Sequence, residues 1–293
     1  MTDKASSVSL HPRQLGENRY VYAVHSRRAR GISIGINLNP DKICNFDCIY
    51  CQVDRTRAPE IRDVDETRLM EELEAVLRRG KDGTLFQEPR FADVPAARRR
   101  LADVSFAGDG EPTTYPRFLE VVRQVVSLKE RLGLQGLKIA VLTNATVLDR
   151  PAVREALGLL DRSDGEIWAK LDAGTEAYYD LVCVPGGTRF ARILANLQEA
   201  ARVRPLVIQS LFLKLRGEGP SAAEIDAYIG RLREIVDKGG AIKLVQIYTV
   251  ARKPPSLEVE PLSDAEVDGI VERVRRETGL PAEGFYGSRA WTA

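Results

Sequence analysis

Three of the four cysteines in this chain lie in one short segment, CNFDCIYC. Three residues separate Cys44 from Cys48, and two separate Cys48 from Cys51. Thiolates at this spacing can share a metal centre, but a structural zinc site needs a fourth protein ligand. His11 or His25 could supply that ligand, although their spacing matches no familiar zinc pattern. Three thiolates alone suit a four-iron cluster whose fourth iron is open to a non-protein ligand.

The composition is that of an ordinary globular protein. Hydrophobic residues make up 44% of the 293 residues and charged residues 29%, which argues against wholesale disorder and against a membrane domain. The formal net charge of +1 gives no sign of a uniformly basic surface that would coat nucleic acid. The sequence shows no signal peptide and no apolar run of membrane-spanning length. We therefore expect a cytoplasmic protein, in which clustered cysteines bind metal more often than they form disulfides.

Apolar, β-branched segments alternate along the chain with segments of helical periodicity. The expected strands are residues 31–38, 102–108, 137–144, 166–173, 205–213 and 242–250. The expected helices are a series from Leu69 that ends at Gly80, residues 118–128, a short helix opened by Pro151, residues 188–203, and two helices opened by Ser221 and Ser263 with capping-box spacing. This alternation predicts a parallel sheet covered by helices. The pattern fits both an open six-unit barrel and a flat doubly wound sheet.

Polar residues gather at the expected strand ends, where parallel α/β folds bind their ligands. The cysteine segment follows the first strand. The later groups are Asp109, Gly110 and Glu111, then Thr143 and Asn144, then Lys170 and Asp172, then Gln209, and finally Gln246 and Tyr248. We expect them on one rim, although turn chemistry alone also favours short polar residues at strand ends.

The segment CNFDCIYC resembles the CxxxCxxC loop of the radical S-adenosylmethionine (radical SAM) superfamily, in which an aromatic residue, here Tyr50, precedes the third cysteine. The resemblance spans about residues 31–250 and favours an α/β fold, the open partial (β/α)6 TIM-like barrel. It implies one 4Fe-4S cluster on Cys44, Cys48 and Cys51, with S-adenosyl-L-methionine on the fourth iron. It also implies an electron donor such as flavodoxin or ferredoxin, and hydrogen abstraction by a 5'-deoxyadenosyl radical.

The segment FAGDGEP, residues 106–112, is similar to the GGEP segment of that superfamily. There, backbone carbonyls and the glutamate hold the ammonium group of the cofactor's methionine. By this resemblance Gly110, Glu111 and Pro112 contact the cofactor. Asp109 stands where the first glycine of the pair is usual.

Thr143 and Asn144 occupy the place where the superfamily often contacts the ribose or the methionine carboxylate. The alternative is that they cap the next helix. The remaining residues expected to bind cofactor are Tyr50, Asp172, Gln209, Gln246 and Tyr248.

Longer segments, including SFAGDGEPTTYP and VQIYTVARKPP, resemble iron-sulfur oxidoreductases related to the tRNA wyosine synthases. Those enzymes hold pyruvate on a lysine, and Lys170 is the candidate here, unless it pairs with Asp172 or lies at the surface. Residues 1–43 contain none of the three cysteines of their second cluster. Cys183 cannot replace them and is expected to be inert packing. The substrate therefore stays unidentified, with an RNA base or a small metabolite as candidates.

The expected organisation is an N-terminal extension (1–30), a core barrel (31–250) with a charged surface loop near 80–100, and a C-terminal helix and tail (251–293). Basic runs at 25–31 and 96–101 should lie near the N-terminal ends of strands, as solvated charge more than as phosphate contacts. Two other functions stay open. One is an activase that installs a glycyl radical on a partner protein, and the other is a non-catalytic metal-binding protein.

Overall fold

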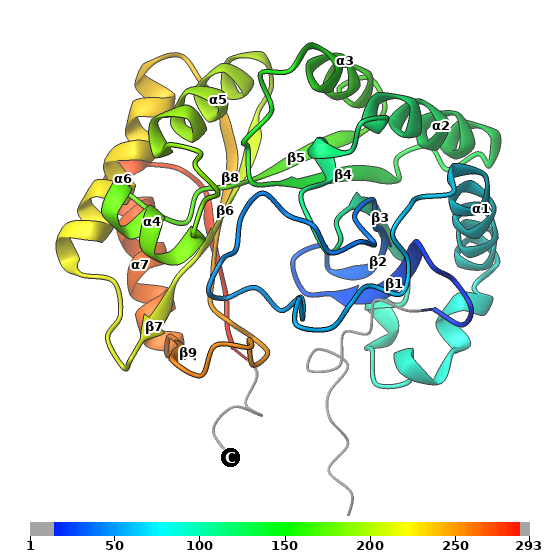
Figure 1. The fold of residues 1–293 in the computed structure, drawn as a ribbon, viewed down its shortest axis with the longest axis horizontal. Helices are drawn as coiled ribbons and strands as arrows, with labels where there is room; N and C mark the ends of the chain where they lie inside the picture. The colour runs from blue at the N-terminus through cyan, green and yellow to red at the C-terminus, as the bar shows by residue number, and fades with distance from the viewer. Residues whose placement is uncertain (1–14, 288–293) are drawn as a thin grey trace, which may run out of the picture. The chain divides into compact units, whose positions relative to one another are not determined.

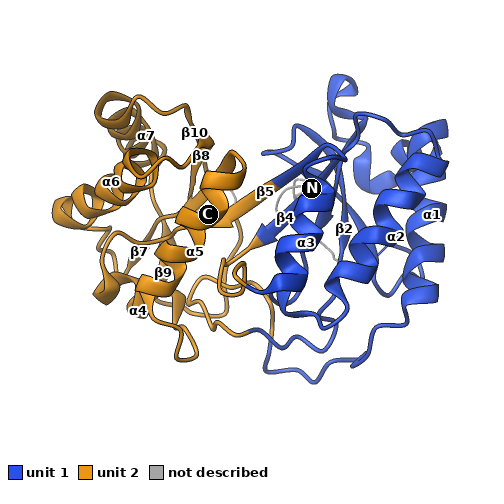
Figure 2. Cartoon of the chain, turned by 90° about the horizontal axis from the view of Figure 1, so that it is seen from above, with its two compact units in different colours: residues 1–44, 55–142, 150–166 blue, residues 45–54, 143–149, 167–293 orange. Residues whose placement is uncertain are grey.

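The computed structural model describes residues 15–287, which form two compact units. The first unit comprises residues up to 44, 55–142 and 150–166, and the second comprises 45–54, 143–149 and 167 onward (Figure 2). Residues 1–14 of the expected extension, with His11, and residues 288–293 of the expected tail lie outside the described residues.

The first unit is built on the strand order β1-β2-β3-β4, in which β1 is antiparallel to β2 and the other neighbours are parallel. Figure 1 shows its three α-helices on one side of these strands. Its elements are β1 (Val21–Ser26), β2 (Gly31–Ile36), α1 (Glu66–Asp82), β3 (Leu101–Phe106), α2 (Phe118–Arg131), β4 (Lys138–Thr143), α3 (Pro151–Leu160) and the short 3-10 helices η1 (Thr84–Gln87), η2 (Pro89–Phe91), η3 (Ala96–Arg98) and η4 (Pro112–Thr114).

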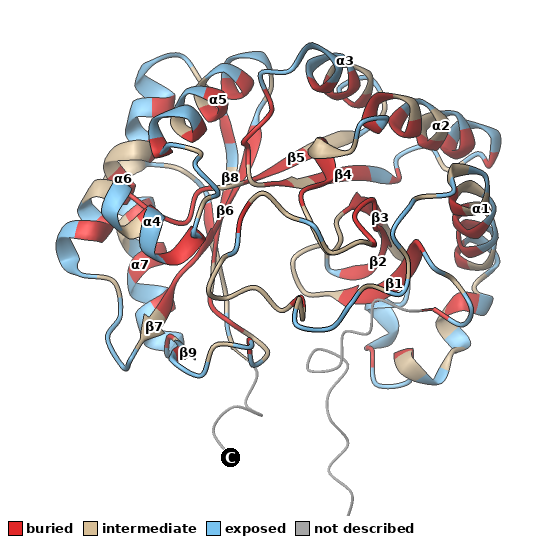
Figure 3. Ribbon diagram, viewed as in Figure 1, coloured by how far each residue is buried: buried red, intermediate tan, exposed pale blue. Residues whose placement is uncertain are grey.

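The second unit carries the parallel strand order β5-β6-β8-β10 and a small antiparallel pair, β7 with β9. Its elements are β5 (Gly165–Lys170), α4 (Glu176–Cys183), α5 (Phe190–Val203), β6 (Leu206–Leu211), β7 (Leu213–Leu215), α6 (Ala222–Asp237), β8 (Ile242–Tyr248), β9 (Val259–Pro261), α7 (Asp264–Thr278) and β10 (Ala282–Phe285). Figure 3 shows the strands mostly buried, and the helices buried only along one face.

All six expected strands are present within a few residues of their predicted bounds. The predicted end of the first helix at Gly80 is wrong. Helix α1 continues to Asp82 and ends at Gly83, whose φ of 86° is the left-handed conformation that glycine adopts easily. Gly80 is needed for packing instead, because a Cβ there would lie 2.6 Å from a methyl carbon of Leu101.

The segment near 80–100 is mostly exposed, as expected of a surface loop, but it is anchored by short 3-10 helices and three buried side chains. It continues α1 and then forms η1, η2 and η3. Leu85, Phe91 and Val94 are buried in it. These apolar residues are too widely spaced among charged ones to show the period of a regular helix or strand.

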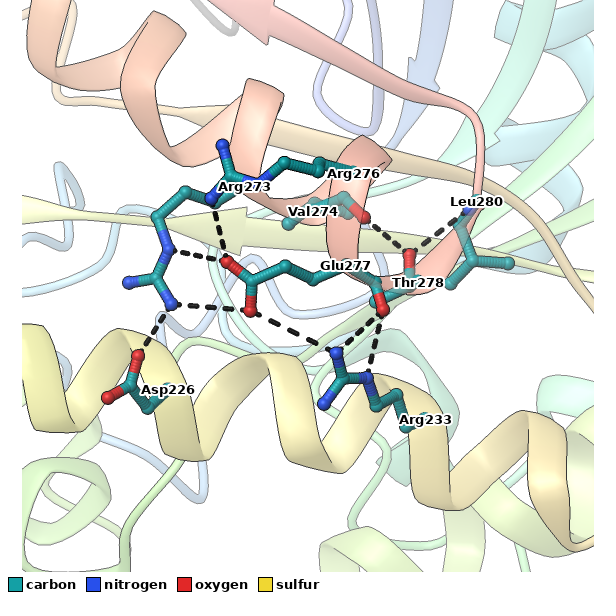
Figure 4. Close-up of polar contacts among 8 residues, drawn as sticks. All are labelled: Asp226, Arg233, Arg273, Val274, Arg276, Glu277, Thr278 and Leu280. Atoms are coloured by element: carbon teal, nitrogen blue, oxygen red, sulfur yellow. Dashed lines mark hydrogen bonds and ion pairs between the residues drawn. The ribbon is translucent and has the colours of Figure 1, made fainter.

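Helices α6 and α7 of the second unit are joined by an ionic network at the surface (Figure 4). Arg273 contacts Asp226 at 2.5 Å and Glu277 at 2.9 Å, and Arg233 donates to the main-chain carbonyl of Glu277 at 2.7 Å. Exposed ion pairs of this kind contribute about 1 kcal/mol or less each. The buried apolar faces of the two helices must supply most of their attachment. No helix among residues 15–287 is both long and apolar enough to cross a membrane.

A buried carboxyl group lies among the strands of the first unit. Asp103 of β3 is 3% exposed and accepts a hydrogen bond from Ser33 of β2, whose hydroxyl is also 3.1 Å from that of Ser105. Burial raises the pKa of Asp103 to about 6, against the opposing effect of the Ser33 hydrogen bond. The folded state therefore binds the Asp103 proton more tightly than the unfolded state does.

Replacing Asp103 with Asn should flatten the dependence of stability on pH. The wild-type protein loses this contribution as the pH rises from about 4 through about 6, because the ionised group is disfavoured only in the folded state. A shift of about two pKa units corresponds to about 3 kcal/mol at most. Urea denaturation of wild type and Asp103→Asn across this range measures the difference. Ser33→Ala should enlarge the effect, and identical pH profiles for wild type and Asp103→Asn would contradict the assignment.

Candidate functional site

The cysteine segment forms a tight turn between its second and third cysteines. The N–H of Cys51 donates to the carbonyl of Cys48 at 2.9 Å. Cys44, Cys48 and Cys51 are all partly exposed. Cys44 belongs to the first unit, and the turn from Cys48 to Cys51 belongs to the second.

Within the second unit, residues 46–49 run antiparallel to residues 182–185 at the C-terminal end of α4. The contacts that define this register are the bridge between Phe46 and Pro185, the hydrogen bond from the N–H of Asp47 to the carbonyl of Val184 at 3.1 Å, and that from the N–H of Ile49 to the carbonyl of Val182 at 3.1 Å. The register places Cys48 opposite Cys183.

The end of α4 is strained where it meets this segment. Val184 has a φ of 42°, in the left-handed region that β-branched residues rarely adopt. Such a conformation costs about 1–2 kcal/mol and persists only where the surroundings hold it. The strain ends the helix at Cys183 and turns the Val184 carbonyl to the N–H of Asp47.

The side chains of Cys48 and Cys183 are hydrogen-bonded to each other. This bond lowers the pKa of Cys48 below its ordinary value, although burial opposes it. The same bond, with burial, raises the pKa of Cys183 well above its ordinary value. Cys183 is buried, as expected for packing, but no local pattern indicated its contact with Cys48.

Tyr50 connects the cysteine turn to a buried polar cluster. Its hydroxyl donates to Oδ2 of Asp172 at 2.5 Å, while Oδ1 of Asp172 accepts from the N–H of Leu211 at 2.7 Å. The same Oδ1 lies 2.8 Å from Nζ of Lys170, which also donates to the hydroxyl of Tyr248 at 2.5 Å. Four predicted site residues from three separate segments thus form one network.

Lys170 is held as a cation in this network. Burial is the largest single effect and would lower its pKa, but the charges of Asp172 and Tyr248 and the hydrogen bonds to both together raise the pKa above the ordinary value. Its Nζ also lies 5.0 Å from the ring centroid of Tyr50 and 4.7 Å from that of Tyr248. Pairing with Asp172, one of the alternatives expected for Lys170, is confirmed. Burial, followed by the charge of Asp172, raises the pKa of Tyr50, so its phenol keeps the proton that it donates.

Apolar contacts hold the same turn from a second direction. Ile49 and Tyr50 pack against a cluster formed by Leu211, Leu213, Val250 and Val259. Beyond the turn, Nε2 of Gln52 donates to the carbonyl of Arg252 at 3.0 Å. The cysteine turn is therefore fixed by both polar and apolar contacts within the second unit.

A closed ring of hydrogen bonds joins the residue after Cys44 to the residues after β4. Asn144 donates to Asn45 at 2.8 Å, Asn45 donates to Thr146 at 2.7 Å, and Thr146 donates to Oδ1 of Asn144 at 2.7 Å. This ring uses both the carbonyl and the amino group of the Asn144 side chain. The ring holds the start of the cysteine segment, ahead of the turn from Cys48 to Cys51.

Thr143 accepts a hydrogen bond from the N–H of Ala145 at 3.0 Å, which shapes the turn after β4. The alternative that Thr143 and Asn144 cap the next helix is wrong, since α3 begins at Pro151 with Arg150 at its N-cap. Their expected contacts with the cofactor stay predictions.

The last two predicted polar residues pair with each other. Nε2 of Gln209 donates to Oε1 of Gln246 at 2.7 Å, and both side chains are buried, on the neighbouring strands β6 and β8. Gln209 also lies opposite Lys170 in the register of β5 with β6. The pair therefore borders the Lys170 network.

In the first unit, the GDGEP turn packs directly against the residue before the first cysteine. A Cβ on Gly110 would lie 2.2 Å from the carbonyl oxygen of Ile43, so only glycine fits. Asp109 is held by Asn37, whose Nδ2 donates to Oδ2 of Asp109 at 2.7 Å, and by Arg55, which donates to the Asp109 carbonyl at 3.2 Å. Asp109 thus stabilises the turn in place of the usual glycine.

Glu111 follows in this turn and is 3% exposed. Its carboxylate accepts from the N–H of Thr113 at 3.1 Å and from the Thr113 hydroxyl, while Pro112 opens η4. Beside Gly110 lies Asn39, which is 8% exposed, and whose buried Oδ1 has no hydrogen-bond partner among the described residues. A buried acceptor without a donor costs about 1–3 kcal/mol, which a bound donor would recover.

These residues fit an iron-sulfur cluster and S-adenosylmethionine. Thiolates are soft ligands for iron, and the lowered pKa of Cys48 favours the metal-binding form. The Glu111 carboxylate and the unpaired Asn39 carbonyl suit a cationic ammonium group. In the part of the chain that the structure describes, no three Cys, His, Asp or Glu side chains converge as ligands for a single ion.

The chain matches a known protein family and is similar to a known protein. The family model described as the radical SAM superfamily matches residues 38–224. A UPF0026 protein of Helicobacter pylori (strain ATCC 700392 / 26695) is 26% identical over 245 residues, which cover 83% of this chain and 70% of the relative.

Two solved structures show the same fold. A radical SAM methyltransferase from Sphaerobacter thermophilus has a TM-score of 0.63 at 14% identity, over 91% of this chain and 69% of the other. TYW1 with a lysine-pyruvate adduct bound has a TM-score of 0.53 at 16% identity, over 92% of this chain and 79% of the other. They confirm the expected α/β fold of the partial-barrel type.

Replacing Lys170 with Met should destabilise the second unit strongly. Asp172 would stay buried without its cation, a loss of about 3–5 kcal/mol for a buried pair. Urea denaturation followed by the fluorescence of Trp168, in the same strand, measures the change.

The double variant Lys170→Met/Asp172→Asn should recover more than half of that loss. Asn carries no charge, keeps Oδ1 as the acceptor of the Leu211 N–H, and can donate from Nδ2 to the Tyr50 hydroxyl. Arg192→Met, which breaks an exposed pair with Asp149, is the control and should change stability by about 1 kcal/mol or less. A Lys170→Met variant as stable as this control would show that the pair of Lys170 with Asp172 does not stabilise the second unit.

Proposed function

This chain belongs to the radical SAM superfamily, and from that premise we propose that its three clustered cysteines bind one 4Fe-4S cluster to which S-adenosyl-L-methionine chelates. When bound, the pair supplies a 5'-deoxyadenosyl radical that abstracts hydrogen from a substrate. Cys44, Cys48 and Cys51 hold the cluster in this proposal. Electrons come from a donor such as flavodoxin or ferredoxin.

The observation that carries the proposal is the contact between the two motifs in the first unit. The GDGEP turn closes on the carbonyl of Ile43, directly before Cys44, with no room for any side chain at Gly110. Residues far apart in the sequence are thus fixed against each other. A cofactor that binds iron at one motif and an ammonium group at the other needs such a fixed relation.

The residues of the first unit that hold the ammonium group are Glu111 and Asn39. The carboxylate of Glu111 is oriented by Thr113 and carries the charge that attracts a cation. Asn39 adds the neutral acceptor that lacks a donor in the protein. Gly110 contributes its small size, and Pro112 fixes the turn that follows.

In the second unit, the network of Tyr50, Asp172, Lys170 and Tyr248 orients the cysteine turn. Thr143, Asn144, Gln209 and Gln246 complete the set of proposed cofactor contacts. Lys170 is a positioning residue in this account. A lysine that forms a covalent adduct, as in the TYW1 structure, must be neutral to attack, whereas Lys170 is held as a cation by Asp172.

The substrate class that we propose is an RNA base or a small metabolite that enters beside this network. The division into an extension, a core at 31–250 and a C-terminal segment remains part of the proposal. Activation of a partner protein and zinc binding are the alternatives. The cysteine experiment below separates zinc binding from the other two, which share the same cluster chemistry.

Replacing Glu111 with Gln should weaken cofactor binding without loss of iron. Removing a charged hydrogen-bond partner costs about 1.5–3 kcal/mol, or about 10–100-fold in Kd. Equilibrium binding of S-adenosylmethionine to anaerobically reconstituted protein measures it. Asn39→Ala should weaken binding less, since its acceptor is neutral. An unchanged affinity in Glu111→Gln would show that this carboxylate does not hold the ammonium group.

Loss of any one of Cys44, Cys48 or Cys51 to Ala should abolish release of 5'-deoxyadenosine, because each thiolate supplies an iron ligand. Reconstituted, dithionite-reduced protein is given S-adenosylmethionine, and the product is quantified by mass spectrometry. Gly158→Ala, on the open face of α3, is the control and should match wild type. Zinc in place of iron, or release retained by a cysteine variant, would refute the proposal.

A further inference from the structure

The fourth cysteine, Cys183, contacts one of the three cysteines proposed to bind the cluster. It is 3% exposed, and the pairing of residues 46–49 with 182–185 places it opposite Cys48. Three backbone contacts between residues 46–49 and 182–185 place the two side chains opposite each other. The backbone therefore holds the two cysteines next to each other.

The strained end of α4 serves the same contact. Val184 is held at a φ of 42° directly after Cys183, and its carbonyl accepts from Asp47, directly before Cys48. A helix that ended with a relaxed residue would avoid this strain. Because this strained conformation persists, the surrounding contacts must hold Cys183 firmly in its position relative to Cys48.

A thiolate that ligates iron keeps lone pairs that can still accept hydrogen bonds. Hydrogen bonds to the sulfurs of an iron-sulfur cluster are among the features that set its reduction potential. A donor favours the reduced cluster, because that form carries one more negative charge. A buried donor at a ligand sulfur acts in a medium that screens it less than water does.

We propose that Cys183 is a positioning residue that donates its S–H to the ligand sulfur of Cys48 and raises the potential of the proposed cluster. This inference rests on the proposed function, since it needs a cluster on Cys48. It assigns Cys183 a role beyond packing and does not make it a fourth iron ligand.

The test is an anaerobic redox titration of the reconstituted protein, with the reduced cluster followed by electron paramagnetic resonance. Cys183→Ala and Cys183→Val both remove the donor, and the second keeps the site filled. Cys183→Ser keeps a donor at the same position. The midpoint potential is read from the position of the titration curve, which a partly unfolded sample does not shift.

Cys183→Ala and Cys183→Val should each bind iron as wild type does and have a more negative midpoint potential, while Cys183→Ser should stay near wild type. Each tenfold change in the reduction equilibrium corresponds to about 59 mV for one electron. A midpoint unchanged in Cys183→Ala and Cys183→Val would overturn the inference and leave the proposed function intact. Loss of iron from both would also overturn it, because Cys183 would then be a ligand. A wild-type protein that binds no cluster would overturn the inference and the proposed function together.

Discussion

The hydrogen bond from Tyr50 to Asp172 is the interaction on which the cysteine turn depends most. It takes a residue between two cysteines and fixes it to a carboxylate that is itself held by Lys170 and by the N–H of Leu211. A buried carboxylate with three partners has little freedom to move. Because Asp172 follows β5 and is bonded to Leu211 of β6, these two strands hold the cysteine turn in place. Ligands that must meet a cluster in one geometry benefit from such support.

Charge pairing and hydrogen bonding determine the protonation of the buried side chains near the cysteine turn. Lys170 and Asp172 neutralise each other, and the pair is surrounded by two aromatic rings, which favours a permanent ion pair over an exchangeable proton. Lys170 keeps its proton, whereas a cysteine of the turn must lose its proton to bind iron. The contact with Cys183 helps Cys48 to do so. The two networks meet at residues 48–50 and give neighbouring side chains different protonation.

Much of this could be predicted from the sequence, because hydrophobic period and motif spacing are local properties. The six strands and the cysteine segment were recognisable in that way. The contacts that were missed depend on tertiary structure. Cys183 looked inert because its neighbours in sequence are apolar, and nothing local shows that the end of α4 meets the cysteine turn. Asn39 had no motif, and only its burial beside Gly110 draws attention to it. Helix α4 was missed because it has only eight residues, and strand β1 because its apolar residues run directly into the basic residues that follow.

In the proposed function, S-adenosylmethionine binds directly to a cluster held by Cys44, Cys48 and Cys51. Electron-nuclear double resonance on the reduced, reconstituted protein can detect this contact, with S-adenosylmethionine labelled with ¹⁵N at its amino group and ¹⁷O at its carboxylate. We expect hyperfine coupling from both labels to the cluster. A normal cluster signal with no coupling from either label would contradict it.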